Sequence, residues 1–155
     1  MDQKLLPFAL QDVPRYTSYP TAVQFQDGFP GDQADRWLAE LPRDASLSIY
    51  VHVPFCQQLC WYCGCNTSVP NSYGRASAYV DSLLSDITRS GKLSGAEKGN
   101  VKHLHFGGGT PTYLSNADLG RILACINGSF GLAPEAEIAL ESDPRGITRD
   151  RAFGL

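Results

Sequence analysis

The sequence has no long hydrophobic run and no strong excess of charge of either sign. No apolar stretch approaches the roughly 18 residues that a membrane-spanning helix needs, so no membrane insertion is expected. The net charge is −3, which gives no electrostatic reason to expect binding to nucleic acid. The first residues, 1–7, do not combine a basic segment with a long apolar one, so we expect no secretory signal and a cytoplasmic protein.

Internal repeats and low-complexity segments are also missing, and the composition is that of a globular domain. Hydrophobic residues make up 43% of the chain and charged residues 19%. A length of 155 residues corresponds to about one domain with a core of its own.

Hydrophobic patterning predicts an irregular leader followed by strands that alternate with helices. The leader is expected over residues 1–45, with one short helix around 34–41, and the domain proper over 46–155. The predicted strands, rich in alternating and β-branched residues, are 47–53, 101–106 and 137–141. Strands that alternate with helices predict an α/β fold with a parallel sheet.

Three helices are predicted between and after these strands. The first covers 75–90 and gives way to a loop over 90–100. The second begins after Ser115, which forms a variant of the capping box with Asp118, and ends at Gly128 or Gly131. Thr148 caps the third, only a few residues before Leu155, so we expect a truncated chain or part of a longer protein.

Four of the five cysteines fall within ten residues, directly after the first predicted strand: Cys56, Cys60, Cys63 and Cys65. In a parallel sheet, binding sites form outside the carboxyl ends of the strands, which is where this loop is expected. Three thiolates in a C-x-x-x-C-x-x-C pattern can hold three irons of a 4Fe–4S cluster and leave the fourth iron open to a substrate.

The spacing leaves two other interpretations open. A structural zinc site needs four ligands, but no second cysteine pair is present, and Cys65 would form a cramped chelate with Cys63. A disulfide is disfavoured by a reducing compartment and by the odd cysteine count. Cys65 is either a further ligand or a free thiol beside the active site, and Cys125 is expected to be a half-buried apolar residue of a helix.

Several residues at or near the ends of the predicted strands are further candidates. The glycine run 107–111 matches neither the Walker nor the dinucleotide-binding pattern, and it is either a tight turn or a place where backbone amides approach a ligand. Glu141 is either a solvated strand end or a ligand for ribose hydroxyls or an ammonium group. Tyr50 either packs in the core or contacts what the cluster binds. His103 and His105 share one face of their strand and are expected to be core histidines.

Together these segments resemble the radical S-adenosylmethionine (SAM) superfamily and, within it, the family of oxygen-independent coproporphyrinogen III oxidases. The stretches that carry the resemblance are 14–21, 50–56, 60–66 and 104–114. The resemblance implies an incomplete (β/α)6 barrel, of which this chain holds the leader and the N-terminal half. A helical C-terminal domain follows the barrel in that family.

The resemblance also implies a set of site residues. Those that would ligate the 4Fe–4S cluster are Cys56, Cys60 and Cys63. Those that would contact the SAM on the open iron are Tyr50, Gly108 and Glu141, and those that would contact a second SAM are Tyr62, Gly109 and Thr110. Cys65 is not assigned by the resemblance; as a free thiol it is a candidate catalytic residue that acts on the substrate, or it only packs beside the site.

The implied reaction is the oxidative decarboxylation of two propionates of coproporphyrinogen III to vinyl groups, which gives protoporphyrinogen IX in haem biosynthesis. Hydrogen abstraction by a 5′-deoxyadenosyl radical would start it, and an electron donor and an acceptor would be needed. The full-length protein is expected to be a monomer, and the chain alone is expected to be inactive. The alternatives are the sister family of haem-trafficking proteins, which typically lacks the leader motif and the Cys-Gly-Cys arrangement, a zinc-binding module and an inactive remnant.

Overall fold

The structure, a computed structural model, describes residues 21–28 and 30–154. The chain divides into two compact units, Met1–Gly31 and Asp32–Leu155. The described part of the first unit contains one short 3-10 helix, η2 (Ala22–Gln24). Residues 14–20 of the leader motif lie outside the described residues, and the predicted boundary at residue 45 stays a prediction.

The second unit has the predicted alternation of strands and helices. Its elements in chain order are α2 (Gln33–Ala39), β1 (Leu47–Val53), α3 (Gly74–Leu93), β2 (Val101–Gly108), η3 (Pro111–Tyr113), α4 (Asn116–Phe130), β3 (Leu132–Leu140) and α5 (Arg149–Phe153). The three strands form one parallel sheet in the order β1-β2-β3. The predicted α/β fold with a parallel sheet is therefore confirmed.

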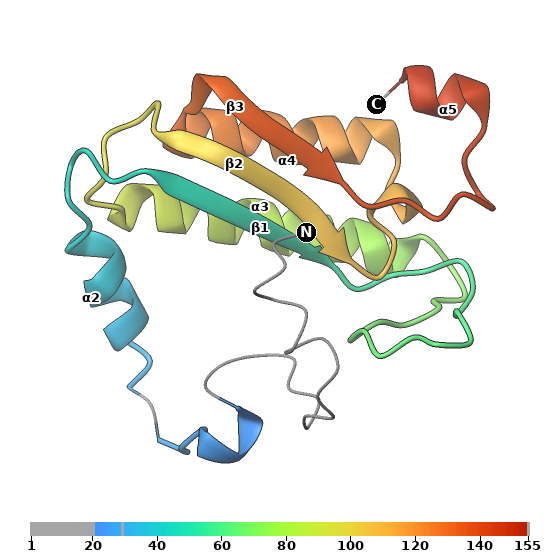
Figure 1. Ribbon diagram of the computed structural model, residues 1–155, viewed down its shortest axis with the longest axis horizontal. Coiled ribbons are helices and arrows are strands. Elements are labelled where there is room, and N and C mark those ends of the chain that lie inside the picture. Colours follow the sequence, from blue (N-terminus) through green and yellow to red (C-terminus); the bar gives the residue numbers. More distant parts are fainter. Residues whose placement is uncertain (1–20, 29, 155) are drawn as a thin grey trace, which may run out of the picture. The chain divides into compact units, whose positions relative to one another are not determined.

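One face of the sheet carries the hydrophobic core. Helices α3 and α4 lie side by side against this face (Figure 1). Alternate residues of β1 and β2 point into the core, as shown by the buried side chains of Val51, Val53, Leu104 and Phe106. The residues between them lie on the other face, which these helices leave uncovered.

Helix α4 begins and ends where the sequence predicts. The Ser115 hydroxyl accepts a hydrogen bond from Asp118 N, and Gly131 ends the helix with a φ of 73°. The predicted variant of the capping box is only half formed, because Ser115 N donates to the Tyr73 hydroxyl (2.7 Å) rather than to the Asp118 carboxylate. The carboxylate instead accepts from the hydroxyls of Tyr73 and Ser115 and from the Arg121 guanidinium.

The loop predicted from residue 90 is wrong, because α3 continues to Leu93. Gly91 therefore lies inside the helix, where a Cβ atom would come within 2.6 Å of Ser129 Cβ on α4. The glycine marks a close approach of two helices rather than the end of one.

Strand β3 begins five residues before its predicted start, at Leu132. This start was not predicted because Pro134 lies in it, and proline lacks the backbone hydrogen-bond donor of a strand residue and usually argues against a strand. Pairing with β2 is irregular between Val101 and His103 and regular from Glu137 onward. Glu141 follows the strand directly, and its amide still donates to Phe106 O (2.9 Å).

The expectation that His103 and His105 are core histidines is wrong. Both side chains lie on the uncovered face of the sheet, with 62% and 44% of their surface exposed. Each faces a carboxylate of the β3 segment, Glu137 at 3.8 Å and Glu141 at 3.0 Å. The reason is the strand alternation itself, since Leu104 and Phe106 already occupy the core side.

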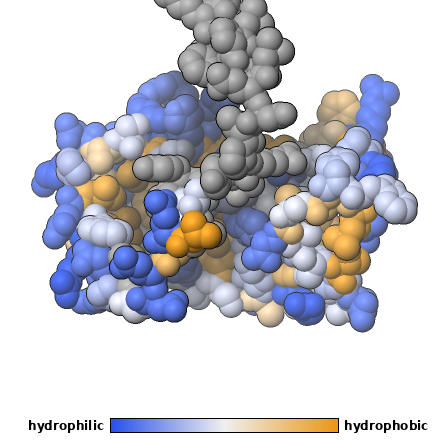
Figure 2. Space-filling model, turned by 60° about the horizontal axis from the view of Figure 1, so that its bottom comes forward, coloured by the Kyte–Doolittle hydropathy of each residue, from blue (hydrophilic) through white to orange (hydrophobic). Residues whose placement is uncertain are grey.

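The face drawn in Figure 2 mixes hydrophilic residues with small, separate hydrophobic patches, and no continuous apolar band crosses its coloured part. Among the described residues, no helix combines the length and the apolar character that crossing a membrane requires.

Candidate active site at the carboxyl end of the sheet

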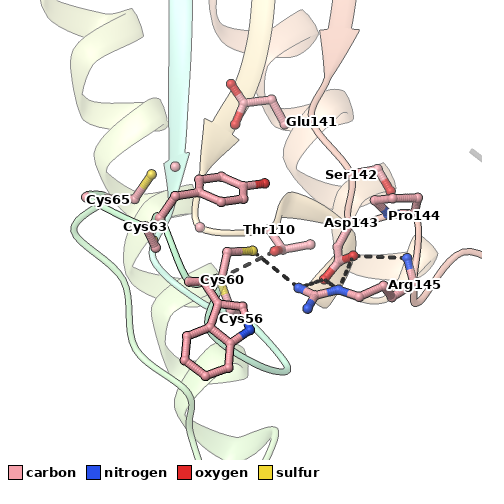
Figure 3. A pocket seen from close by; sticks show the side chains of 15 residues that line it. Cys56, Cys60, Cys63, Cys65, Thr110, Glu141, Ser142, Asp143, Pro144 and Arg145 are labelled. Carbon is pink, nitrogen blue, oxygen red and sulfur yellow. Dashed lines mark hydrogen bonds and ion pairs between the residues drawn. The ribbon is translucent and has the colours of Figure 1, made fainter.

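A pocket of about 570 Å³ lies where the three segments that follow the strands meet. The carboxyl ends of parallel strands share one edge of the sheet, which brings residues far apart in sequence together here. Figure 3 shows the cysteines on one side of the pocket and residues 141–145 on the other, with Thr110 between them. The lining residues are Cys56, Cys60–Cys65, Gly108–Thr110 and Glu141–Arg145.

The start of the cysteine loop is fixed by its returning limb. Cys56 N donates to Ser68 O (3.0 Å) and Ser68 N donates to Pro54 O (3.0 Å), which forms a short parallel bridge beyond β1. The buried Cys56 thiol lies 3.2 Å from Thr67 Oγ1 and accepts a hydrogen bond from Thr110 Oγ1 at 3.4 Å. This thiol is therefore held from both sides.

The other cysteines of the loop become steadily more accessible. Cys60 is partly buried, whereas Cys63 and Cys65 are exposed, and all of them are free thiols. Hydrogen bonding with Cys63, followed by a smaller burial effect, raises the pKa of the Cys65 thiol. Within the described part of the chain, no three cysteine, histidine or carboxylate side chains gather closely enough to hold a metal ion.

The chemistry and placement of these donors nevertheless suit an iron–sulfur cluster. Cys56, Cys60 and Cys63 are unpaired, belong to one loop and line one pocket. Three thiolates are the protein ligands that a cubane cluster with one open iron requires. The glycine turn leaves space beside these cysteines that any side chain would fill. A Cβ atom on Gly109 would collide with Thr67 Oγ1 and lie 3.0 Å from the Cys56 sulfur.

The glycine turn after β2 passes close to the cysteine loop. Gly108 has a φ of 108°, and a Cβ there would lie 2.8 Å from the His52 ring. Gly109 N donates to Val53 O (2.8 Å) and Thr110 N donates to Phe55 O (2.8 Å). These two amides are thus engaged, so a ligand that approaches Gly109 meets its Cα and carbonyl groups.

A polar cluster on the uncovered face of the sheet continues the site. The rings of Tyr50 and His105 stack with centroids 5.7 Å apart, and His105 Nε2 lies 3.0 Å from Glu141 Oε1. Burial, and to a smaller extent the Glu141 charge, raises the pKa of Tyr50. A Cβ on Gly107 would lie 2.9 Å from the Tyr50 ring and 3.0 Å from Glu141, so glycine keeps this corner open.

The structure brings most of the residues singled out in the sequence to one place. Those that line the pocket are Cys56, Cys60, Tyr62, Cys63, Cys65, Gly108, Gly109, Thr110 and Glu141. Tyr50 does not line the pocket and meets it through His105 and Glu141. Cys125 lies partly buried on α4, away from the site, with its thiol against Leu84 O.

Three further polar residues belong to the site: His105, which was expected in the core, and Asp143 and Arg145, which were not predicted as site residues. The strand alternation that places Tyr50 on the uncovered face of β1 places His105 on the same face of β2, so the pattern of the two strands could have indicated it. Asp143 and Arg145 follow β3, and the Arg145 guanidinium donates to Cys60 Sγ at 3.3 Å. Hydrogen bonds from Arg145 hold the pKa of Asp143 below its usual range. Only their place after a strand end could have indicated them.

Comparisons with known proteins agree with this geometry. The family model described as Radical SAM superfamily matches residues 50–153. An oxygen-independent coproporphyrinogen III oxidase of Bradyrhizobium diazoefficiens is 44% identical over 138 residues, which are 89% of this chain and 30% of that protein. One of Mannheimia haemolytica is 37% identical over 131 residues, which are 84% of this chain and 88% of that protein.

A solved structure gives the same result for the fold. The radical SAM enzyme coproporphyrinogen III oxidase of Escherichia coli superposes with a TM-score of 0.79 at 38% identity, over 90% of this chain and 31% of that one. The chain thus spans about 30% of the length of the Bradyrhizobium relative and of the Escherichia coli structure. The chain belongs to the radical SAM superfamily and, within it, to the family of oxygen-independent coproporphyrinogen III oxidases.

Proposed function

We propose that this chain provides the cluster-binding and SAM-binding part of an oxygen-independent coproporphyrinogen III oxidase. The observation that carries the proposal is the pocket in which the thiols of Cys56, Cys60 and Cys63 share a wall with Gly108 and face Glu141. The two relatives described above, both named for this activity, are 44% and 37% identical to the chain over the aligned residues.

In this proposal Cys56, Cys60 and Cys63 hold a 4Fe–4S cluster through three of its irons. When bound, the cluster and SAM supply one-electron chemistry that generates a carbon radical able to take a hydrogen atom from a substrate. The chain's own part is to orient these groups and to exclude water. Cys56 contributes most to orientation, because Thr67, Thr110 and the backbone fix its position.

Two groups of residues are proposed to bind SAM. Tyr50, Gly108 and Glu141 would contact the SAM at the open iron, and Glu141 offers a carboxylate that suits ribose hydroxyls or an ammonium group. Tyr62, Gly109 and Thr110 would contact a second SAM. The Tyr62 ring is exposed at the rim of the pocket, where it can stack on an adenine.

The proposal also includes a substrate, electron carriers, a cellular compartment and an oligomeric state. Coproporphyrinogen III would be the substrate, its propionates would be converted to vinyl groups, and Cys65 would be a catalytic thiol at the pocket. An electron donor and an acceptor complete the reaction. We place the protein in the cytoplasm as a monomer, and the five unpaired cysteines support a reducing compartment.

The test is anaerobic reconstitution of the chain with iron and sulfide. We expect about four irons per chain and the broad visible absorption of an iron–sulfur cluster. Serine at position 56, 60 or 63 should abolish most of the iron binding, whereas the matched control Cys125→Ser should leave it unchanged. One equivalent of tightly held zinc and no iron would contradict the proposal and favour the zinc-binding alternative.

A second assay measures the binding of SAM, coproporphyrinogen III and haem to the reconstituted chain, and it separates the oxidase from a haem-trafficking protein. The proposal predicts that the reconstituted chain binds coproporphyrinogen III or SAM in preference to haem. Stoichiometric haem binding without any SAM binding would favour the trafficking alternative.

A further inference from the structure

Arg145 connects two segments of the site that lie 85 positions apart in sequence. Its Nη2 donates to Cys60 Sγ at 3.3 Å, and its Nε and Nη2 also donate to the Asp143 carboxylate at 2.6–3.0 Å. Figure 3 shows the guanidinium reaching from the segment after β3 across the pocket to the cysteine loop. Among the described residues, the Arg145–Cys60 hydrogen bond thus links these two walls of the pocket.

The guanidinium is held in place by contacts within its own turn. Arg145 N donates to Asp143 Oδ1 at 2.9 Å, so backbone and side chain both bind the same carboxylate. Only 17% of the Asp143 side chain is exposed, and Gly146 N donates to Asp143 O at 3.1 Å, which closes a turn around Pro144. Proline fixes its own φ, so this turn has little freedom. The planar fork of an arginine then presents its remaining donors in a set direction.

The contact places the permanent positive charge of the guanidinium against the sulfur of Cys60, a predicted cluster ligand. Arginine stays protonated under all ordinary conditions, so its charge does not depend on the protonation of its neighbours. Hydrogen bonds to the sulfurs of an iron–sulfur cluster, and charges near it, tune its reduction potential. A positive donor on a cysteine sulfur stabilises the more negative, reduced cluster and therefore raises the potential.

The Asp143 carboxylate reduces this effect, because it is paired with the same guanidinium. Its carboxylate accepts from Nε and Nη2, and Nη2 also donates to Cys60 Sγ. The group that donates to the sulfur is nevertheless the positive one, which keeps a net effect in this direction. Asp143 acts as the orienting partner of the arginine.

We infer that Arg145 is a positioning residue that holds Cys60, and with it the cysteine loop, against the segment after β3, and that its guanidinium raises the reduction potential of a cluster ligated by Cys60. The inference rests on the proposed function, because it requires a cluster on Cys56, Cys60 and Cys63. It goes beyond that function by assigning a role to a residue outside the cysteine motif.

The experiment compares Arg145→Gln, Arg145→Lys and the wild type after anaerobic reconstitution without SAM. The matched control is Arg149→Gln, which removes the same charge from a nearby arginine that packs on Phe153 instead. For each protein the midpoint potential is measured by mediated redox titration, with the electron paramagnetic resonance signal of the reduced cluster as the readout. The rate of iron loss to a chelator is measured alongside.

We expect a more negative potential and faster iron loss in Arg145→Gln, a smaller change in Arg145→Lys, and wild-type values in Arg149→Gln. If Arg145→Gln does not fold, as judged by circular dichroism, the Arg145→Lys protein decides through the same two measurements. Potentials equal to the wild type, or an equal shift in Arg149→Gln, would overturn the inference. A wild-type chain that binds no cluster would instead refute the proposed function itself, so the two failures are distinguishable.

Discussion

His105 Nε2 lies 3.0 Å from Glu141 Oε1, and the His105 ring stacks on Tyr50. One histidine on the central strand thus connects Tyr50 of β1 with Glu141, which follows β3; both are proposed to contact SAM. Tyr50 and His105 are register partners on β1 and β2, so the sheet itself fixes the stack. The histidine has no proposed contact with SAM of its own and would act by placing Glu141 and Tyr50.

Replacing this histidine should therefore weaken SAM binding without removing the cluster. We expect His105→Ala to raise the dissociation constant for SAM by about tenfold, which corresponds to the loss of roughly one hydrogen bond. Iron content should stay at the wild-type level. The measurement is equilibrium dialysis of labelled SAM against the reconstituted chain.

The matched control for this prediction is His103→Ala. His103 lies on the same uncovered face and also faces a carboxylate, Glu137, but it is two residues farther from the carboxyl end of β2. Its replacement should leave SAM binding unchanged. Equal weakening by both variants would show a general effect on the sheet rather than a role of the His105–Glu141 contact.

Much of the fold followed from the sequence because local patterns and burial agree there. The alternation in β1 favours a strand and the Ser115 cap favours a helix start, and both were predicted correctly from residues close together in sequence. The end of α3 was not predictable in the same way. Gly91 has the local character of a helix end, and only the contact with Ser129, a residue distant in sequence, explains why the helix continues.

The site shows the same division between local and distant information. The cysteine spacing is a local pattern, and it predicted where the pocket lies. The partners of those cysteines come from other segments, such as Thr110 on Cys56 and Arg145 on Cys60. No spacing rule connects these pairs, because they meet only once the parallel sheet has brought the strand ends together.

The role of Cys65 is tested by removing its thiol. We expect Cys65→Ser to retain the full iron content, because a fourth thiolate would occupy the iron that SAM needs. Cys65 is exposed, unlike the buried Cys56, so the loop should tolerate the change. Iron and sulfide analysis after reconstitution provides the measurement. A loss as large as that in Cys56→Ser would make Cys65 a ligand.

The close approach of the glycine turn to Cys56 predicts a steric effect. In Gly109→Ala the new Cβ would meet Thr67 Oγ1, and it would lie 2.8 Å from Phe55 O and 3.0 Å from Cys56 Sγ. The backbone carbonyl cannot rotate away, so we expect a loss of stability of about 1–3 kcal/mol, typical of overpacking, together with reduced iron content. Urea unfolding and iron analysis measure the two effects.

Gly120→Ala is the matched control for the glycine turn. A Cβ at Gly120 would meet nothing within 4 Å, and the residue lies on the exposed side of α4. Alanine should stabilise this helix by up to about 1 kcal/mol and leave iron binding unchanged. If Gly109→Ala behaved like this control, the turn would have more space beside Cys56 than the structure indicates.

The buried carboxylate of Asp118 on α4 binds the residue that precedes α3. Asp118 accepts a hydrogen bond from the Tyr73 hydroxyl at 2.6 Å and is only 9% exposed. This bond, followed by those from Arg121 and Ser115, holds the pKa of Asp118 below its ordinary value of 3.8 despite burial. Because the pKa is depressed by folding, the ionised carboxylate stabilises the fold above pH 3.8, and this stabilisation is lost as the pH falls through the lowered pKa.

Tyr73→Phe removes the strongest of these hydrogen bonds and also leaves Ser115 N without its partner. We expect it to lower the free energy of unfolding at pH 7 by about 1.5–3 kcal/mol, as for other hydrogen bonds to charged groups. The loss should shrink as the pH is lowered from 5 towards 2, because the wild type then loses its advantage. Urea unfolding across this range measures it, with Tyr113→Phe, which alters the stacked neighbouring ring, as the control. A difference between Tyr73→Phe and wild type that stays constant with pH would show that the hydroxyl acts through Ser115 N alone and not through the charge of Asp118.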